Sequence, residues 1–230
     1  MSELISEING IKFCYREGTS DLKTFEEVIG RDVYRKKGMS IAPGEHWIDC
    51  GGNVGAFTLL ACSLGARVTV YEPDPYSCKM LEKNLKANGF EAEIVCAGLV
   101  HNQLKKANLY VGNNGNVWRN SLFKNWNGRG IRVDCVNFDE VVPDGVCVKM
   151  DIEGAEMPIL ESTQRKFKKL VFEWSFDIDG SLKRFRKCID SLKINYFVSI
   201  QDKRFYELED DFVPKRFIVK ATNVFCYEKG

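Results

Sequence analysis

The fold of this chain is decided by the stretch Trp47-Ile48-Asp49-Cys50-Gly51-Gly52-Asn53-Val54-Gly55-Ala56-Phe57. Apolar residues lead into Asp49, a turn with three glycines follows, and an apolar run then extends from Phe57 to Cys62. This pattern predicts a buried strand, a tight turn and the start of a helix. Glycine is needed where the backbone bends at positive φ or approaches another group closely. The helix start then offers free N–H groups to a polar ligand.

A second strand is predicted from Val68 to Glu72, directly before Pro73. Because only one short helix separates the two strands, the carboxylate of Glu72 is expected beside the glycine turn. In nucleotide-binding α/β folds, an acid at this place accepts hydrogen bonds from ribose hydroxyls. The two strands together therefore predict a site for a ligand that contains a nucleoside.

Strands and helices alternate through most of the chain. We predict strands at 47–49, 68–72, 93–97, 146–151 and 169–176, helices at 57–64, 75–88 and 181–192 and from about 155, and a final antiparallel pair at 196–200 and 216–227. Such alternation favours a mostly parallel twisted sheet with helices on both faces. We therefore expect an α/β fold in which residues 1–230 form a single domain.

Two segments depart from this alternation. Residues 1–43 contain Asn9-Gly10, a strong two-residue turn signal between strands, and a short helix pattern at 24–30. We expect a flap made of a hairpin and a helix. Residues 99–136 contain strand candidates at 107–111 and 131–136 between turn-forming asparagines and glycines. We expect a β-rich insertion that forms a wall near the site.

The composition excludes several classes of protein. The 230 residues carry 33 basic and 32 acidic side chains, so the net charge of +1 gives no global electrostatic reason to bind nucleic acid. The nine cysteines are scattered and none forms a Cys-x-x-Cys pair. We expect buried free thiols in a reducing compartment, rather than a disulfide framework or a zinc site. No signal segment or membrane-spanning run is evident, so we expect a cytoplasmic protein with no membrane partner.

Three acids are expected at the carboxyl edge of the sheet, where ligands of open α/β sheets bind: Asp49, Glu72 and Asp151. A dinucleotide site would have the glycine pattern Gly-x-Gly-x-x-Gly, whereas this chain has Asp-x-Gly-x-Asn-x-Gly. An acid at the start of the turn suits a cofactor with a cationic amino-acid tail better than one with a pyrophosphate. S-adenosylmethionine is such a cofactor.

Three motifs in this order resemble the FkbM-type methyltransferases: residues 49–55, Glu72-Pro73, and Lys149-Met150-Asp151-Ile152-Glu153-Gly154-Ala155-Glu156. The resemblance covers roughly residues 44–175. It implies a class I Rossmann-like methyltransferase fold and transfer of a methyl group from S-adenosylmethionine to an oxygen, commonly a hydroxyl of a sugar, a glycan or another small molecule. The residues we expect to contact the cofactor are Asp49, Gly51, Asn53, Gly55, Glu72, Pro73, Ala97 and Asp151.

An alcohol acceptor must lose a proton, so a catalytic base is expected. Asp151 ends the fourth main strand, and Glu153 follows in the turn; either carboxylate is a candidate base. Alternatively, the two carboxylates hold Mg²⁺ together with Glu173, and the metal lowers the pKa of the hydroxyl. We favour the base without a metal. His101, which follows the third strand, is a further candidate base, although a lone histidine is more often structural.

The acceptor surface is the least determined part of the site. Trp118, Arg119, Trp126, Glu173 and Trp174 are candidates for contacts with a sugar, but packing in the core is an equal alternative for the tryptophans. The acceptor class also stays open. RNA or protein methylation, or a non-catalytic binding module on the same fold, are the alternatives to a small-molecule or glycan O-methyltransferase.

Overall fold

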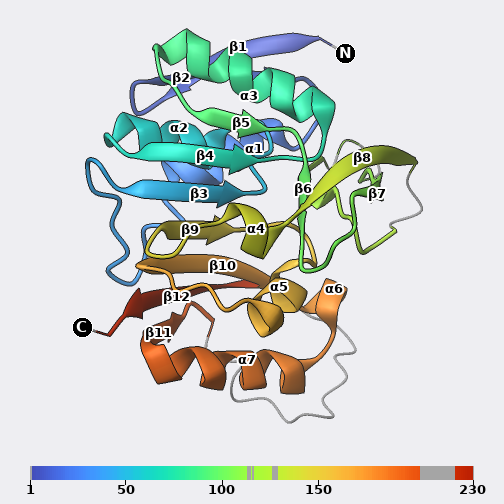
Figure 1. Ribbon diagram of the computed structural model, residues 1–230. Helices are drawn as coiled ribbons and strands as arrows, with labels where there is room; N and C mark the ends of the chain where they lie inside the picture. Colours follow the sequence, from blue (N-terminus) through green and yellow to red (C-terminus); the bar gives the residue numbers. More distant parts are fainter. Residues whose placement is uncertain (1, 113–114, 116, 126–128, 203–220, 230) are drawn as a thin grey trace.

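A seven-stranded sheet lies at the centre of the computed structural model, which describes residues 2–112, 115, 117–125, 129–202 and 221–229 (Figure 1). The strand order is β11-β12-β10-β9-β3-β4-β5. Parallel pairing joins β3 (His46–Cys50), β4 (Arg67–Tyr71), β5 (Glu93–Val95), β9 (Cys147–Met150) and β10 (Lys169–Ser175). Strand β12 (Ala221–Glu228) runs antiparallel between β10 and β11 (Tyr196–Ile200). The mostly parallel sheet and the antiparallel C-terminal pair are thus confirmed. The part of the last predicted strand before residue 221 lies outside the described residues.

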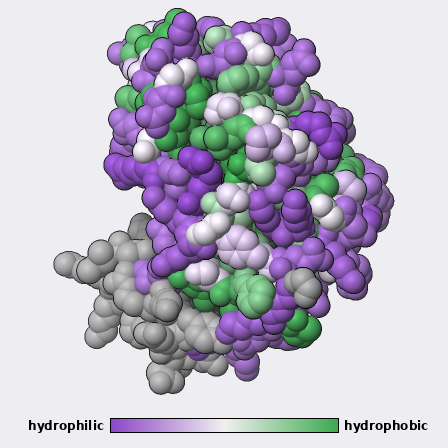
Figure 2. Space-filling view, turned by 90° about the vertical axis from the view of Figure 1, so that its left-hand side faces the viewer, coloured by the Kyte–Doolittle hydropathy of each residue, from purple (hydrophilic) through white to green (hydrophobic). Residues whose placement is uncertain are grey.

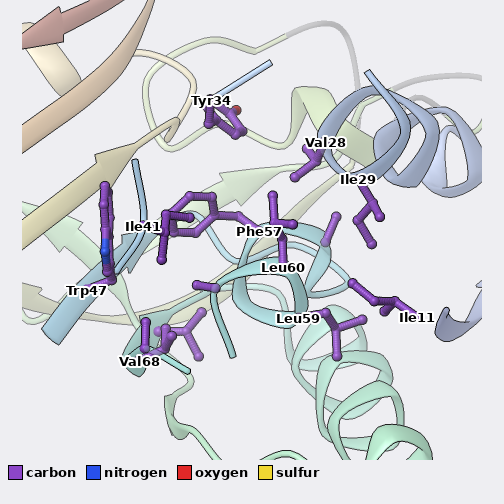
Figure 3. Packing of buried hydrophobic residues seen from close by; sticks show 14 of the residues in the cluster. Ile11, Val28, Ile29, Tyr34, Ile41, Trp47, Phe57, Leu59, Leu60 and Val68 are labelled. Atoms are coloured by element: carbon purple, nitrogen blue, oxygen red, sulfur yellow. The ribbon is translucent and has the colours of Figure 1, made fainter. Parts of the chain in front are cut away.

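Alternating side chains divide the interior into two hydrophobic cores, one on each face of the sheet. On β3, Trp47 faces the first core and Ile48 the second. The first core is closed by the N-terminal segment, α2 (Ala56–Ser63) and α3 (Pro75–Asn88), as Figure 3 shows for part of it. The second is closed by α4 (Phe138–Val141), α5 (Glu156–Ser162) and α7 (Leu182–Asn195). Burial on both faces explains why the central strands are almost continuously apolar.

Helix α3 shows how local signals set an element's ends. The side chain of Asp74 accepts hydrogen bonds from the backbone N–H groups of Tyr76 and Ser77, and Pro75 occupies the first turn. Gly89 closes the helix in the left-handed conformation, with φ of 67°. The predicted helix 75–88 is confirmed.

The N-terminal segment packs against the main domain. Strands β1 (Glu3–Ile8) and β2 (Ile11–Arg16) form the predicted hairpin, and Asn9 and Gly10 both have positive φ, as a tight hairpin turn requires. The amide of Asn84 on α3 accepts a hydrogen bond from Cys14 N (2.6 Å) and donates to Cys14 O (3.1 Å). The short helix α1 (Asp21–Phe25) continues into a π-helical turn, η1 (Glu26–Gly30). This region replaces the single helix predicted at 24–30.

A second, three-stranded sheet lies beyond the carboxyl ends of β3 and β4 (Figure 1). It consists of β6 (Gly98–Val100), β8 (Gly130–Asn137) and β7 (Lys106–Tyr110), and it accounts for both strands predicted in the 99–136 segment. The 3-10 turn η2 (Val117–Arg119) lies in the same segment, and the short helix α6 (Phe176–Asp179) follows β10.

One expectation from the cysteines needs correction. Cys78 on α3 and Cys96 after β5 form a disulfide, so not all nine cysteines are free thiols. No local pattern indicates this pair, because the two residues are 18 positions apart and meet only where α3 packs beside β5. Cys50, Cys62 and Cys147 are free, as expected, and so are four others.

None of the described helices combines the length and apolarity needed to cross a bilayer. Figure 2 shows the side of the molecule at the amino ends of the parallel strands, and hydrophilic residues cover most of it.

Candidate functional site

A cavity of about 420 Å³ lies at the carboxyl ends of the parallel strands, which is the edge predicted for the ligand. Its walls come from four parts of the chain: the glycine turn after β3, the ends of β4, β9 and β10, the insertion, and the N-terminal segment. A volume of this size is typical of small-molecule sites. The sheet thus brings together residues from almost the whole length of the chain.

The glycine turn is shaped by contacts that leave no room for a side chain. Gly51 has φ of 86°, and a Cβ on it would lie 2.0 Å from the backbone oxygen of Asp151. A Cβ on Gly52 would lie 2.2 Å from Val70 on β4. The N–H groups of both glycines donate to the carbonyl of Tyr71, at 2.9 and 3.1 Å. The glycines therefore let the turn lie directly against β4 and the segment after β9.

Asp49 lies behind the cavity wall, and its charge is matched within the chain. Its carboxylate is fully buried, forms an ion pair with Lys149 Nζ (3.0 Å) and accepts a hydrogen bond from Thr58 (2.7 Å). Lys149 is the register partner of Asp49 on β9, and its ammonium also donates to Gly51 O at 2.7 Å. The cation that this motif acid contacts is therefore a lysine of the chain itself. Burial of the pair tightens the turn against β9.

Glu72 directly follows β4 and lines the cavity while almost fully buried. One carboxylate oxygen accepts from Asn53 N (2.7 Å) and the other from Asp74 N (2.8 Å). Burial raises the pKa of Glu72 to about 7, although the two backbone N–H groups act in the opposite direction. Its neighbour Pro73 also lines the cavity. Each carboxylate oxygen keeps a further lone pair with which to accept a ligand hydroxyl.

The other predicted cofactor residues divide into two groups. Gly51, Asn53 and Asp151 line the cavity. Gly55 and Ala97 are not among its lining residues: Gly55 starts α2 with φ of 97°, and Ala97 is buried beside Gly98 and Leu99, which do line it. The side-chain oxygen of Asn53 is buried and has no hydrogen-bond partner among the described residues.

Three carboxylates meet on the opposite side of the cavity. Asp151, Glu153 and Glu173 each place one oxygen within 4.8 Å of the others. Burial raises the pKa of Glu153 and of Glu173 well above the usual range, and the neighbouring Asp151 charge adds to both shifts. Tyr34 from the N-terminal segment donates a hydrogen bond to Asp151 (2.7 Å). The cluster therefore concentrates groups able to accept a proton or a cation.

The loop that carries Asp151 and Glu153 is held by its own hydrogen bonds. The carboxylate of Glu156 accepts from Ile152 N (2.6 Å) and Gly154 N (2.8 Å), and so ties together the backbone of the loop. Glu153 has φ of 51°, and its carbonyl accepts from the hydroxyl of Ser121 in the insertion. The insertion thus fixes the backbone at the acidic cluster.

Two of the residues predicted for catalysis or acceptor binding also lie away from the cavity. His101 is exposed after β6 and is not among the lining residues. Trp174 is buried in the second core, where its ring stacks on Phe185 at 4.3 Å between centroids and its N–H donates to Asp179. Because the second core lies on the other face of the sheet from Glu173, we assign Trp174 to packing rather than to the acceptor surface.

Of the remaining acceptor candidates, Arg119 and Glu173 line the cavity, and Arg119 forms an ion pair with Asp177. The side chain of Trp118 and all of Trp126 lie outside the described residues.

The cavity residues that were not anticipated from the sequence include Tyr34, Lys149 and Asn223. Lys149 carried a signal, because a charged residue in the apolar run of a central strand requires a buried partner. Tyr34 and Asn223 carried none, because each reaches the site only through the packing of distant segments.

Comparisons with known proteins identify a family and a fold. A family model described as the methyltransferase FkbM domain matches residues 49–198. No curated protein sequence matches the chain. Among solved structures, a methyltransferase from Pyrococcus furiosus is 13% identical, with a TM-score of 0.51, and the match covers 96% of this chain and 91% of that one.

Two further structures are similar in fold. A fibrillarin/Nop5p complex is 9% identical, with a TM-score of 0.52 and coverage of 98% and 97%. The tRNA (uracil-54, C5)-methyltransferase of Pyrococcus abyssi, in complex with S-adenosyl-L-homocysteine, is 12% identical, with a TM-score of 0.50; the match covers 97% of this chain and 43% of that one. At such identities the similarity concerns the fold, which is that of the class I methyltransferases.

Proposed function

The chain belongs to the FkbM methyltransferase domain family, and from this premise we propose that it transfers a methyl group from S-adenosylmethionine to a hydroxyl of a sugar, a glycan or another hydroxylated small molecule. The observation that carries the proposal is the single cavity in which Glu72, beside the glycine turn, faces the acidic cluster of Asp151, Glu153 and Glu173. One end of this cavity suits a nucleoside, and the other suits an acceptor that must lose a proton.

The residues at the first end fit the cofactor. Glu72 has lone pairs left for ribose hydroxyls, and the buried oxygen of Asn53 still needs a donor such as an ammonium or a hydroxyl. Bound there, the cofactor supplies an activated methyl group on a sulfonium. Lys149, already paired with Asp49, holds the turn in place by its bonds to the turn's backbone.

The residues at the second end fit an alcohol acceptor. A hydroxyl placed near Glu153 or Glu173 would meet a carboxylate whose pKa burial raises well above its usual range, so that it accepts the proton more readily. A positioned base contributes roughly 10²–10⁴-fold in rate. Alignment of acceptor and donor in one closed cavity contributes up to about 7–11 kcal/mol. Asp151, fixed by Tyr34, and Arg119 complete this wall.

RNA is the second candidate acceptor, because the archaeal tRNA methyltransferase shares the fold. The net charge of +1 gives no broad basic surface for an RNA backbone, and we therefore favour the small hydroxylated acceptor. A non-catalytic binding role would leave the crowded carboxylates without a catalytic use. The free thiols of seven cysteines support a cytoplasmic location, whereas the Cys78–Cys96 disulfide does not.

The proposal is tested first by calorimetric titration with S-adenosylmethionine and S-adenosylhomocysteine. We expect micromolar binding that is lost in Glu72→Ala and kept in Glu82→Ala, an exposed acid on α3 that matches it in type. A panel of glycans, hydroxylated metabolites and transcribed tRNA is then screened for transfer of a radiolabelled methyl group. A folded protein that binds neither ligand would refute the proposal, and labelling of tRNA alone would replace the small acceptor with RNA.

A further inference from the structure

We propose that Asp151, Glu153, Glu173 and Asn223 bind a hard divalent cation, Mg²⁺ or Mn²⁺, inside the cavity. The inference rests on the proposed function and adds to it the group that would hold the acceptor hydroxyl. It also revises our preference, from the sequence, for a carboxylate base acting without a metal.

The spacing of the carboxylates fits one ion. One oxygen from each of the three acids lies within 4.8 Å of the others. Two ligands on opposite sides of Mg²⁺, each at about 2.1 Å, are separated by about 4.2 Å, and the separation reaches about 5 Å for larger ions. A single ion can therefore reach all three oxygens after small side-chain adjustments.

The backbone holds these acids in place. Glu173 is on β10, whereas Asp151 and Glu153 follow β9 in the loop that Glu156 and Ser121 secure. A preformed position matters because Mg²⁺ requires near-ideal geometry.

Asn223 provides an independent indication of a ligand. It is the register partner of Glu173 in the β10–β12 ladder, so both side chains project from the same face of the sheet, and both line the cavity. Asn223 is only 8% exposed, and its side-chain oxygen has no hydrogen-bond partner among the described residues. A buried amide oxygen without a donor is costly, and an ion beside Glu173 would satisfy it.

The cations of the chain near this place are already engaged. Lys149 pairs with Asp49, and Arg119 pairs with Asp177. The donor recorded to the side chain of Asp151 is the neutral hydroxyl of Tyr34. Three crowded, half-buried carboxylates must therefore bind protons or a cation to offset their repulsion. Because every group in the set offers oxygen, a hard cation matches it better than zinc or copper.

The ion would lower the pKa of the acceptor hydroxyl and hold that hydroxyl in position. Bound to the cation, the hydroxyl loses its proton to a carboxylate oxygen that the ion leaves uncoordinated, and the proton then passes to water. The acceptor oxygen forms its bond to the methyl carbon as the carbon–sulfur bond breaks, and the electron pair of that bond stays on sulfur.

The test uses the full chain, freed of metal with EDTA, and follows free Mn²⁺ by its electron paramagnetic resonance signal. We expect one Mn²⁺ per chain, displaced by Mg²⁺. Glu173→Gln and Asn223→Leu should each weaken the affinity at least tenfold, whereas Asn223→Asp, which adds a charged oxygen, should strengthen it. Asp134→Asn, an exposed acid on β8 outside the cavity, is the matched control and should change nothing.

Binding of S-adenosylhomocysteine by the same metal-free samples separates the two proposals. If the protein binds S-adenosylhomocysteine but not Mn²⁺, the metal site is overturned and the proposed function stays intact. Weak Mn²⁺ binding that none of the substitutions alters would show an adventitious ion only and would also overturn it. If Glu173→Gln weakens Mn²⁺ binding but neither substitution of Asn223 changes it, Asn223 is not a ligand of the ion. Failure to bind S-adenosylhomocysteine would instead count against the proposed function.

Discussion

The acidic side chains at the two ends of the cavity differ in how their charges are partnered. At the end formed by the glycine turn, each acid has a specific partner: Asp49 has Lys149 and Thr58, and Glu72 has two backbone N–H groups. At the other end, Asp151, Glu153 and Glu173 crowd together, and the donors to their side chains among the described residues are neutral hydroxyls, Tyr34 to Asp151 and Ser175 to Glu173. Pairing offsets the cost of burying the acids at the first end and fixes the shape of the glycine turn. At the second end, the carboxylates keep negative charge available for a ligand. We infer that the first end is built for binding and the second for chemistry.

The largest effect is expected from breaking the buried pair at the first end. Lys149→Met would leave Asp49 buried without a cation, and we expect a loss of about 3–5 kcal/mol in the free energy of unfolding. Urea denaturation measures it, and Asp49→Asn in the same chain should restore part of the loss. Arg31→Met, which breaks an exposed pair with Glu27, should cost less than about 0.5 kcal/mol. Equal losses in the two variants would mean that the first end is not held by its charges.

The next effect concerns the shape of the turn. Gly51→Ala forces a side chain into the left-handed region and against the backbone oxygen of Asp151, so we expect a loss of about 3 kcal/mol and no binding of S-adenosylhomocysteine. Gly89→Ala has nearly the same φ but open space around it, and should cost about 1–2 kcal/mol with binding unchanged. The difference between the two losses in the free energy of unfolding measures the close contact of Gly51 with the backbone of Asp151. A difference near zero would show that the turn can move away from β9.

The sequence pointed to much of the first end and, at the second, to the three acids but not to the residues that surround them. The glycine spacing, the strand ends and the acid before Pro73 are local patterns, so Gly51, Asn53 and Glu72 could be placed before the structure was known. The second end depends on contacts between distant segments. Tyr34 lies 117 positions before Asp151, and Asn223 lies opposite Glu173 only because β12 inserts antiparallel beside β10. Trp174 lies in the core, the alternative that the sequence left open, because strand alternation puts it on the other face from Glu173.

A smaller effect is expected from the tyrosine at the second end. Tyr34→Phe removes a hydrogen bond to a charged carboxylate, worth about 1.5–3 kcal/mol, so methyl transfer should slow by tenfold or more. Affinity for S-adenosylhomocysteine should stay within about twofold, because the tyrosine acts on Asp151 and not on Glu72. Tyr227→Phe is the control: it removes a hydrogen bond to Lys37 O in the same N-terminal segment, away from the cavity. If both variants slow transfer equally, the effect belongs to the stability of the segment.

The smallest effect is a pH dependence at the first end. The pKa of Glu72 is raised to about 7 in the free protein, so the carboxyl is mostly protonated at pH 6 and mostly ionised at pH 8. Ribose hydroxyls donate to the ionised form, and the affinity for S-adenosylhomocysteine should therefore be about tenfold weaker at pH 6 than at pH 8. Calorimetry in two buffers with different heats of ionisation would show a proton released on binding at pH 6.

As the pH rises, the contribution of Glu72 to the stability of the fold should fall while the affinity for S-adenosylhomocysteine rises. The two opposite trends make the assignment to Glu72 specific. A carboxyl whose pKa is higher in the folded state than in the unfolded one stabilises the fold below the unfolded pKa, and this contribution is lost as the pH rises through about 7. Glu156, whose pKa is also raised to about 7, contributes to this stability slope, but it does not line the cavity and so should not affect binding. Glu72→Gln should flatten the binding profile, whereas Glu156→Gln should flatten only the stability profile. Binding that is independent of pH in the unsubstituted chain would mean that Glu72 is already ionised, and that its two backbone bonds outweigh its burial.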